Sequence, residues 1–193
     1  MNDTTNLQPP RVIQAIQRDT DASGFPMASE PQTGSLLRTL AATKPSGKFL
    51  ELGTGTGLST AWILTGMDQD STLLSVDNDE RAQSIARRHL DHDARLTFQL
   101  AEGAALLATL KGQSFDFIFA DTWPGKYDHL DEALALLKPG GLYIVDDMSP
   151  QPNWPPGHDQ KAASLITTLE QHPDLTITKL SWATGLILAT KQR

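Results

Sequence analysis

Between residues 48 and 147, short apolar segments alternate with longer segments of helical periodicity, and this alternation limits the fold more than any other feature. The apolar segments are nearly continuous hydrophobic runs, which is typical of strands buried on both faces. Such strands form parallel sheets that helices cover on each side. We expect strands at 48–53, 72–77, 96–101, 115–121 and 142–147, and helices at 57–66, 79–90, 103–110 and 127–137.

The C-terminal part of the chain breaks this alternation. A helix expected at 159–171 is followed by two strand-like segments, 176–182 and 185–191, with only two residues between them. Strands this close in sequence pair as an antiparallel hairpin. The predicted fold class is therefore α/β. It is a doubly wound Rossmann-like sheet of seven strands, mostly parallel with an antiparallel C-terminal hairpin strand, with helices on both faces.

Two further helices are expected before the sheet, at 11–20 and 34–43, joined by an access loop rich in Gly, Pro and Ser. The chain has 193 residues, which is an ordinary length for one domain, and no long linker divides it. We therefore expect a single domain over residues 1–193. Its N-terminal helices and access loop lie within 1–47, and its Rossmann-like core spans 48–193.

Charge and cysteine content narrow the classes of partner. Sixteen Lys and Arg against 23 Asp and Glu give a net charge of −7, which makes the chain a poor general binder of nucleic acid or anionic membrane. The chain has no cysteine, so disulfides and thiolate zinc sites are excluded and a reducing compartment is favoured. We also recognise no signal peptide and no apolar run of about 18 residues that could span a membrane. We expect a cytoplasmic protein with no nucleic-acid and no membrane partner.

Three alternating glycines, Gly53, Gly55 and Gly57, directly follow the first core strand in the segment FLELGTGTGLSTAW. Glycine permits a sharp turn from strand to helix, lets a ligand approach the backbone, and leaves N–H groups that favour a negative group. Dinucleotide-binding enzymes carry Gly-x-Gly-x-x-Gly instead, and the sixth position here is Leu58. A tight turn that binds no ligand is the alternative interpretation.

Two acidic residues refine the ligand class. Glu51 lies inside the first core strand, and Asp77 ends the second strand about twenty residues later. A carboxylate at that place binds the ribose hydroxyls of an adenosine-containing ligand, which includes both NAD and S-adenosylmethionine. The alternative for Asp77 is a helix N-cap, which is weaker because Asn78 or Asp79 could serve equally well.

In this order of motifs the chain resembles the class I S-adenosylmethionine-dependent methyltransferases. The shared pattern is E-x-G-x-G-x-G, an acid after the second strand, an acid after the third strand, KPGG at 138–141, and the antiparallel end hairpin. A narrower resemblance, to the catechol O-methyltransferase-like group of bacterial O-methyltransferases, rests on FPMASEPQTGSLL, FDFIFADTWPGKYDHL and YIVDDM. The match covers roughly residues 25–190.

The resemblance implies S-adenosyl-L-methionine as cofactor and S-adenosylhomocysteine as product. The residues that it places around the cofactor come from the access loop, the glycine turn and the ends of the next strands. They are Met27, Ala28, Glu51, Gly53, Thr54, Gly55, Gly57, Ser59, Asp77, Asn78, Glu102, Gly103, Asp121 and Trp123. Two more of these, besides the glycines and Asp77, have other interpretations. Glu102 could be an exposed acid favoured at a helix start, and Trp123 could be a loop aromatic that shields the sheet edge.

Three aspartates, Asp121, Asp146 and Asp147, are expected at the carboxyl ends of two strands. Carboxylates that converge there are costly unless a cation or protons neutralise them. The resemblance implies that they hold a divalent cation, Mg²⁺ above all, which suits hard oxygen ligands. Asp147 stands where the family usually has Asn. The alternative is that Asp147 caps the next segment and no metal binds.

The catalytic residues implied are Asp121, Lys126 and Tyr127. The family places a general-base lysine three residues after the first metal aspartate, but that position is Pro124 here, and proline cannot act as a base. Lys126 is either a replacement that swings in or a surface lysine. His158 and Asp159 are further candidates, in a loop whose Trp154 could form a substrate-side wall.

Our hypothesis from the sequence is an S-adenosylmethionine-dependent methyltransferase that transfers a methyl group to a hydroxyl of a small molecule, an aromatic diol among the candidates, with divalent-cation assistance. The alternatives are a metal-independent small-molecule methyltransferase and a non-catalytic S-adenosylmethionine-binding module. A nicotinamide oxidoreductase is disfavoured by the glycine spacing and the end hairpin. The resemblance also implies a homodimer formed through the N-terminal helices.

Overall fold

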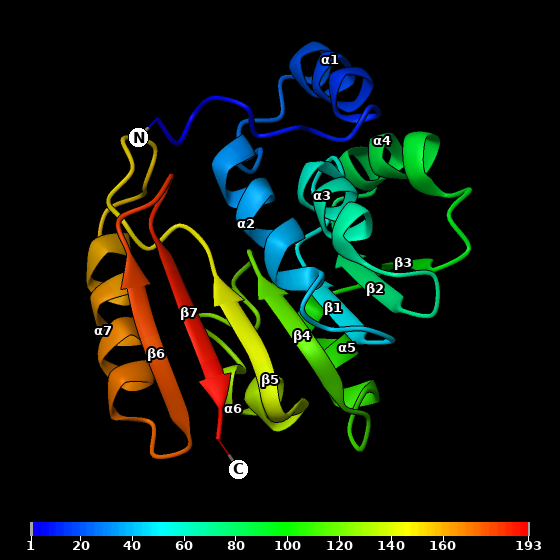
Figure 1. The fold of residues 1–193 in the computed structure, drawn as a ribbon. Coiled ribbons are helices and arrows are strands. Elements are labelled where there is room, and N and C mark those ends of the chain that lie inside the picture. The colour runs from blue at the N-terminus through cyan, green and yellow to red at the C-terminus, as the bar shows by residue number, and fades with distance from the viewer. Residues whose placement is uncertain (1, 193) are drawn as a thin grey trace.

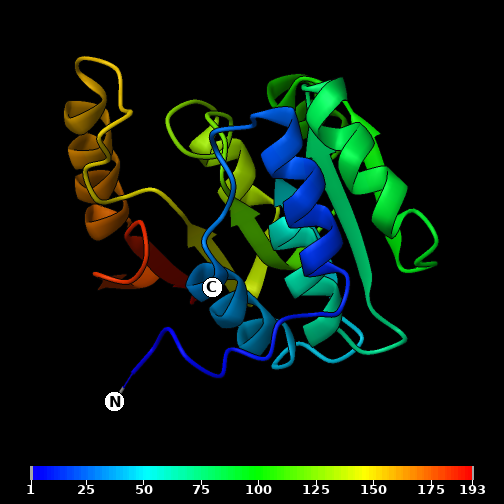
Figure 2. The same ribbon diagram turned by 90° about the horizontal axis from the view of Figure 1, so that it is seen from above.

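The structure is a computed structural model that describes residues 2–192, and one seven-stranded sheet runs through it with helices on both faces (Figures 1 and 2). The strands are β1 (Lys48–Leu52), β2 (Thr72–Asp77), β3 (Leu96–Leu100), β4 (Phe115–Ala120), β5 (Leu137–Val145), β6 (Leu175–Leu180) and β7 (Leu186–Lys191). The helices are α1 (Ile13–Ser23), α2 (Pro31–Ala41), α3 (Leu58–Gly66), α4 (Glu80–Leu90), α5 (Gly103–Thr109), α6 (Leu130–Ala135) and α7 (His158–Gln171).

The strand order is β3-β2-β1-β4-β5-β7-β6. Strands β1 to β5 pair in parallel, whereas β7 is antiparallel to both β5 and β6. The predicted fold class is therefore confirmed, including the antiparallel C-terminal hairpin.

Alternation along the central strands divides the apolar side chains between two cores. In β4, Ile118 and Ala120 face the core that α5, α6 and α7 cover, while Phe117 and Phe119 face the core under α1 to α4. Both sets are fully buried, which is why the sequence shows a continuous apolar run rather than alternation. Figure 2 shows the two helical layers on opposite sides of the sheet.

The N-terminal helices are fixed to the sheet beside the glycine turn. The hydroxyl of Thr20 in α1 donates to Oγ1 of Thr56, at 2.8 Å. Helix α2 packs closely on α3 because Gly34 leaves room for the indole of Trp62, and a Cβ at residue 34 would lie 2.2 Å from that ring. Proline at the first position of α2 starts this helix earlier than expected and shortens the access loop to residues 24–30.

The helix predicted at 127–137 is wrong at both ends, because α6 covers only Leu130–Ala135 and β5 already begins at Leu137. Residues 123–128 instead form a tight turn in which the N–H groups of Lys126, Tyr127 and Asp128 all point to the carbonyl of Trp123. Gly125 adopts φ +91°, which closes the turn, and α6 begins only at Leu130. This turn directs the side chains after β4 toward α7 rather than along a helix.

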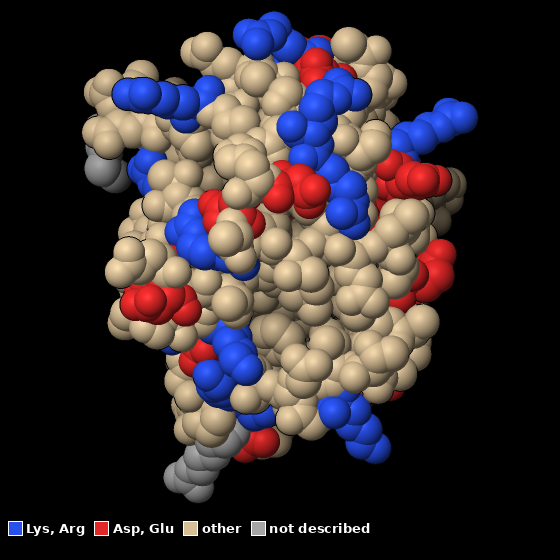
Figure 3. Space-filling view, turned by 90° about the vertical axis from the view of Figure 1, so that its right-hand side faces the viewer, with Lys and Arg blue, Asp and Glu red and all other residues tan. Residues whose placement is uncertain are grey.

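Within residues 2–192, no helix has the length and apolar character needed to cross a bilayer. Figure 3 shows the face at the β3 edge of the sheet, where basic and acidic side chains are interspersed. Several of these pair locally, as Arg88 of α4 does with Asp19 of α1 at 2.7 Å. The charges on this face therefore do not form the continuous basic surface that nucleic acid binding uses.

Candidate functional site

The sheet order reverses between β1 and β4 (Figure 1), and most of the residues predicted from the sequence lie at the ends of β1 to β5 or in the loops that directly follow them. In open α/β sheets such a switch point leaves a crevice at the carboxyl ends of the strands, where ligands bind. The candidate site is therefore at the edge of the sheet that the predicted residues share.

The glycine turn brings the ends of three strands together. The N–H of Gly53 donates to the carbonyl of Val76 in β2 at 2.9 Å, and the N–H of Gly55 donates to Oδ2 of Asp77 at 2.7 Å. Gly53 has φ +103°, and a Cβ there would lie 2.8 Å from the carbonyl oxygen of Asp121 after β4. Glycine is thus required both for the backbone conformation and for the close approach of β4.

Beside this turn, two carboxylates and an amide come together. The Asn78 amide donates to both carboxylate oxygens of Glu102, at 3.1 and 3.2 Å. The carboxylate of Asp77 receives the N–H of Asp79 at 2.8 Å in addition to that of Gly55. Asp79 itself caps α4 by accepting two N–H groups of its first turn. The cap interpretation of Asp77 is therefore excluded, and its carboxylate has capacity left for a ligand.

Glu51 lies beneath the turn and is completely buried. Its carboxylate accepts hydroxyl hydrogen bonds from Ser59 at 2.6 Å, Thr60 at 2.6 Å and Ser75 at 2.5 Å. Burial raises the pKa of Glu51 to about 7. The predicted cofactor residues Glu51 and Ser59 thus bond each other and tie β1 and β2 to the first turn of α3.

This buried carboxyl predicts a pH-dependent stability. In the unfolded chain Glu51 titrates near its ordinary value of 4.5, whereas in the folded protein it titrates near 7, so the native state binds more protons between these values. Stability contributed by this group is complete below pH 4.5 and is lost as the pH rises through 7. Relative to Glu51→Gln, the free energy of unfolding of the wild type should fall by about 3 kcal/mol between about pH 4 and pH 8.

Urea denaturation of the two proteins at several pH values measures this difference. Glu80→Gln is the matched control, because Glu80 is exposed at the start of α4 and should show almost no such change. A constant difference between the wild type and Glu51→Gln across this range would contradict the assignment.

The three predicted aspartates lie in one electrostatically coupled neighbourhood. Asp121 accepts the Ser29 hydroxyl of the access loop at 3.3 Å, and burial, followed by the charge of Asp146, raises its pKa well above the usual range. Burial likewise raises the pKa of Asp146 to about 6, although Thr184 donates to its Oδ1 at 2.5 Å. Asp147 adopts φ +56°, and its N–H donates to Asp146 Oδ1 at 2.8 Å.

Positive charge is already present in this neighbourhood. Lys126 is buried, and its Nζ donates to the backbone carbonyl of Asp146 at 2.6 Å. Among the described residues 2–192, no three or more His, Cys, Asp or Glu side chains are arranged to hold a metal ion. Carboxylate oxygens are suitable donors for Mg²⁺, but their arrangement here does not fit such a centre. Lys126 is also not the surface lysine of the alternative interpretation.

The access loop covers the glycine turn with a residue that sequence reasoning missed. The ring of Phe25 lies 3.4 Å from the position that a Cβ of Gly55 would occupy. Met27, with 67% of its surface exposed, and Ala28 are exposed in the same loop, and Trp123 after β4 is 46% exposed. The only signal for Phe25 was an aromatic residue in a Gly- and Pro-rich loop before the glycine turn.

The turn after β4 packs four rings together. Trp123 lies 5.6 Å from Tyr127 and 6.1 Å from His158, and Trp154 lies 4.4 Å from His158, between ring centroids. The predicted cofactor residue Gly103 packs closely against this turn. A Cβ on residue 103 would lie 2.9 Å from Cβ of Pro124. The cluster of Trp123, Tyr127, Trp154 and His158, here called the aromatic wall, flanks the aspartates.

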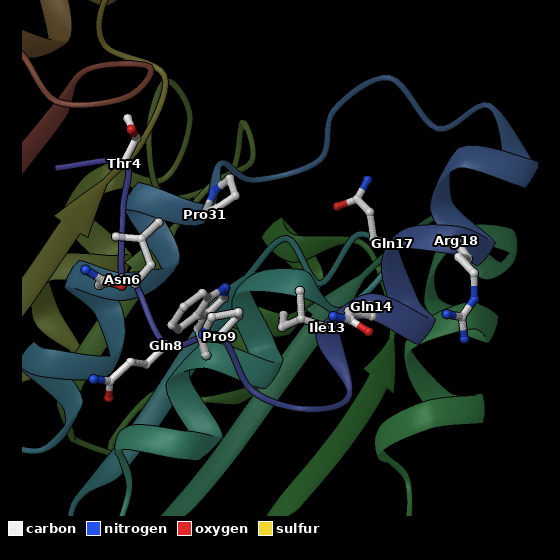
Figure 4. Close-up of a pocket in the computed structure, with 11 residues that line it drawn as sticks. Thr4, Asn6, Gln8, Pro9, Ile13, Gln14, Gln17, Arg18 and Pro31 are labelled. Atoms are coloured by element: carbon white, nitrogen blue, oxygen red, sulfur yellow. The ribbon is translucent and has the colours of Figure 1, made fainter. Parts of the chain in front are cut away.

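A cavity of about 840 Å³ lies elsewhere, between the N-terminal segment, α1, the start of α2 and Trp62 (Figure 4). A second cavity, of about 620 Å³, lies between the turn after β4 and α7 and is lined by Lys126, Tyr127 and Lys161 among others. The predicted cofactor residues line neither cavity. The second cavity reaches the back of the aromatic wall, whereas the first is separate from the candidate site.

Comparison with known proteins gives a consistent result. The family model of the methyltransferase domain matches residues 50–148, which contain the glycine turn, Asp77 and the three aspartates. A curated relative from Mycolicibacterium vanbaalenii, named "Putative O-methyltransferase", is 32% identical over 123 residues, covering 61% of this chain and 54% of the relative. The chain thus spans about half the length of that relative.

Solved structures resemble this fold over almost the whole chain. A structure from Klebsiella pneumoniae, described as a "putative O-methyltransferase", has a TM-score of 0.83 and 26% identity, over 95% of this chain and 90% of that one. The O-methyltransferase from Bacillus cereus in complex with S-adenosylhomocysteine has a TM-score of 0.84 and 20% identity, over 97% and 94% of the two chains. The second of these supports the fold alone.

Proposed function

The chain belongs to the methyltransferase domain family, and from this premise we propose that it transfers the methyl group of S-adenosylmethionine to a hydroxyl group of a small molecule. The observation that carries the proposal is the hydrogen bond from Gly55 N–H to Asp77, beside the Asn78–Glu102 pair. This arrangement offers carboxylates for a ribose diol and for an adenine amino group at a turn whose backbone is open to a ligand. The O-methyltransferase names of the relatives support a hydroxyl acceptor.

The residues present suit an adenosyl ligand. Asp77 would hold the ribose hydroxyls, Glu102 and Asn78 would face the adenine, and Gly53 and Gly55 would border the methionine part. When bound, the cofactor supplies an activated methyl group on a sulfonium centre. The chain then needs to align the acceptor with that methyl group and to exclude water, and Phe25 and Met27 of the access loop are placed to cover the site.

Divalent-cation assistance stays a prediction, and the mechanism proposed here includes no step that requires it. The buried ammonium of Lys126 supports the metal-independent alternative, because it supplies a cation among the three aspartates. Turnover measured in EDTA and then with added Mg²⁺ tests the requirement. Loss of turnover in EDTA, restored by Mg²⁺, would establish a metal role despite the arrangement described above.

Ligand-dependent thermal stability tests the proposed cofactor. S-adenosylhomocysteine at a hundred times its dissociation constant adds about 2.7 kcal/mol to stability, which raises the Tm of a domain of this size by about 5–10 °C. NADH at the same concentration should leave the Tm unchanged, because Leu58 replaces the glycine that dinucleotide-binding turns carry.

Release of S-adenosylhomocysteine during incubation with a panel of phenols and aliphatic alcohols separates an enzyme from a binding module. A shift with NADH and none with the adenosyl ligands would overturn the proposal, once mass spectrometry has shown that the purified protein carries no retained cofactor. Adenosyl binding without product from any acceptor would favour the non-catalytic alternative.

A further inference from the structure

A tyrosine and a histidine 31 residues apart in sequence meet between the turn after β4 and the start of α7. The hydroxyl of Tyr127, in the turn after β4, lies 3.0 Å from Nε2 of His158, the first residue of α7. Their ring centroids are 5.1 Å apart and their planes are nearly perpendicular, at 84°. The contact joins the loop of one strand to a helix that follows another, and nothing in the predicted cofactor site accounts for it.

The imidazole of His158 is held in an environment that leaves one nitrogen without a partner. His158 is only 8% exposed. Its Nδ1 atom is buried and makes no hydrogen bond within residues 2–192. Trp154 packs on the ring from one side and Trp123 approaches it from another. An unpaired buried polar atom costs free energy, so a histidine kept at this position needs a reason other than packing.

Tyr127 links this imidazole to the turn that follows β4, at the carboxyl edge of the sheet. Burial, and then the negative charges of Asp147 and Asp121, raise the pKa of Tyr127 to about 12, so the phenol stays protonated at neutral pH. The only hydrogen-bond partner of its hydroxyl among the described residues is Nε2 of His158. A phenol is both a donor and an acceptor, so it can take up one proton while giving its own to the imidazole and carry no charge itself.

Several other groups near this pair are already engaged in hydrogen bonds or cannot accept the proton of a hydroxyl substrate. Lys126 is committed as a donor to the carbonyl of Asp146. Asp121 already accepts the Ser29 hydroxyl, and Oδ1 of Asp146 accepts both the Thr184 hydroxyl and the N–H of Asp147. Pro124 has no titratable group. An imidazole with one free lone pair is the general base that proteins use most often near neutral pH.

We propose that Tyr127 and His158 form a relay that accepts the proton of the methyl acceptor. This inference rests on the proposed function. In the step, the acceptor O–H bond breaks and its oxygen bonds to the methyl carbon, whose bond to the sulfonium sulfur breaks with the electron pair left on sulfur. The acceptor proton moves to the Tyr127 hydroxyl while the phenolic proton moves to Nε2 of His158. The positive charge of the sulfonium thus ends on the imidazolium, and total charge is unchanged.

The charges around His158 allow this cycle. Burial and then the ammonium of Lys126 lower its pKa, as Lys161 does, whereas Asp147 and Asp159 raise it. The resting imidazole is therefore neutral at pH 7, and the two carboxylates favour the imidazolium once it forms. The acidic limb of the kcat/KM profile should accordingly lie below the ordinary histidine value of about 6.5.

Two substitutions and two acceptors test the relay. Tyr127→Phe and His158→Gln should each lower kcat with catechol by at least about 100-fold, the usual contribution of a positioned base, and both should abolish the acidic limb. With 4-nitrocatechol, whose nitro group acidifies the ring hydroxyl, the loss should be less than about tenfold because little proton transfer remains to be assisted. His92→Gln, at an exposed site after α4, is the matched control.

S-adenosylhomocysteine affinity, measured by calorimetry, should be the same in all four proteins. If the wild type fails to bind it, the proposed function fails and not the relay. If Tyr127→Phe and His158→Gln bind it and methylate catechol at the wild-type rate, or lose equal activity on both acceptors, the relay is overturned and the pair is only structural.

An NMR measurement of the His158 tautomer tests the relay without a methyl acceptor. In ¹⁵N-histidine-labelled protein, the signals absent from His158→Gln report the state of this imidazole. The relay requires a neutral ring whose Nε2 carries no proton, because Tyr127 donates to it, and Tyr127→Phe should change this tautomer. A proton on Nε2 in the wild type at pH 7, with either a neutral or a charged ring, would overturn the proposal.

Discussion

Replacing Gly57 by alanine is expected to lower the free energy of unfolding by about 2–5 kcal/mol, the sum of backbone strain and overpacking. Gly57 precedes α3 with φ +93°, a left-handed conformation that costs other residues about 1–2 kcal/mol. A Cβ there would also lie 2.7 Å from Cβ and 3.0 Å from Cα of Ala86 in α4, which is closer than packed carbon atoms approach. The glycine turn and α4 would have to move apart to make room for the added methyl group. The side chain of Leu90 in α4 lies close to the same position and adds to the crowding.

Chemical denaturation of the wild type and Gly57→Ala measures this loss. Gly112→Ala isolates the strain, because Gly112 has nearly the same φ, +89°, with no atom within 4 Å of its would-be Cβ. We expect Gly112→Ala to cost only about 1–2 kcal/mol. Equal losses in the two variants would show that the contact with α4 does not limit this position.

The alternation of apolar and helical segments was sufficient to predict the sheet and its antiparallel end, because local periodicity and burial act together along each element. It failed at residues 127–129, where the periodicity of the following helix continues into a turn. A left-handed glycine at 125 and three N–H groups that share the carbonyl of Trp123 determine that turn. Such hydrogen bonds leave no periodic trace in the sequence.

The candidate site was predictable in part for a similar reason. Gly53 and Asp77 follow strands directly, so the carboxyl edge of a parallel sheet brings them together whatever the helices do. The hydroxyl partners of Glu51, the ring of Phe25 over Gly55 and the contact of Tyr127 with His158 depend on packing between segments distant in sequence. Without the structure, Glu51 could be placed in the strand but not assigned its buried hydrogen bonds.

Replacing Asp77 by alanine is expected to raise the Kd of S-adenosylhomocysteine by about 100- to 10,000-fold. The carboxylate lies at the carboxyl end of β2, held by the N–H groups of Gly55 at 2.7 Å and Asp79 at 2.8 Å, with its remaining lone pairs available for a ribose diol. Hydrogen bonds to a charged group contribute about 1.5–3 kcal/mol each, and 1.4 kcal/mol corresponds to tenfold in affinity, so losing two gives this range. Isothermal titration calorimetry measures it directly.

Asp79→Ala is the control that separates binding from folding. Asp79 caps α4 one residue beyond Asn78, so its loss should cost about 1 kcal/mol of stability while leaving the Kd within a few fold of the wild type. Asp77→Asn should fall between the wild type and Asp77→Ala, because the amide keeps one acceptor oxygen but loses the charge. If Asp79→Ala weakens the ligand as much as Asp77→Ala does, the effect comes from the loop as a whole and Asp77 does not hold the ribose.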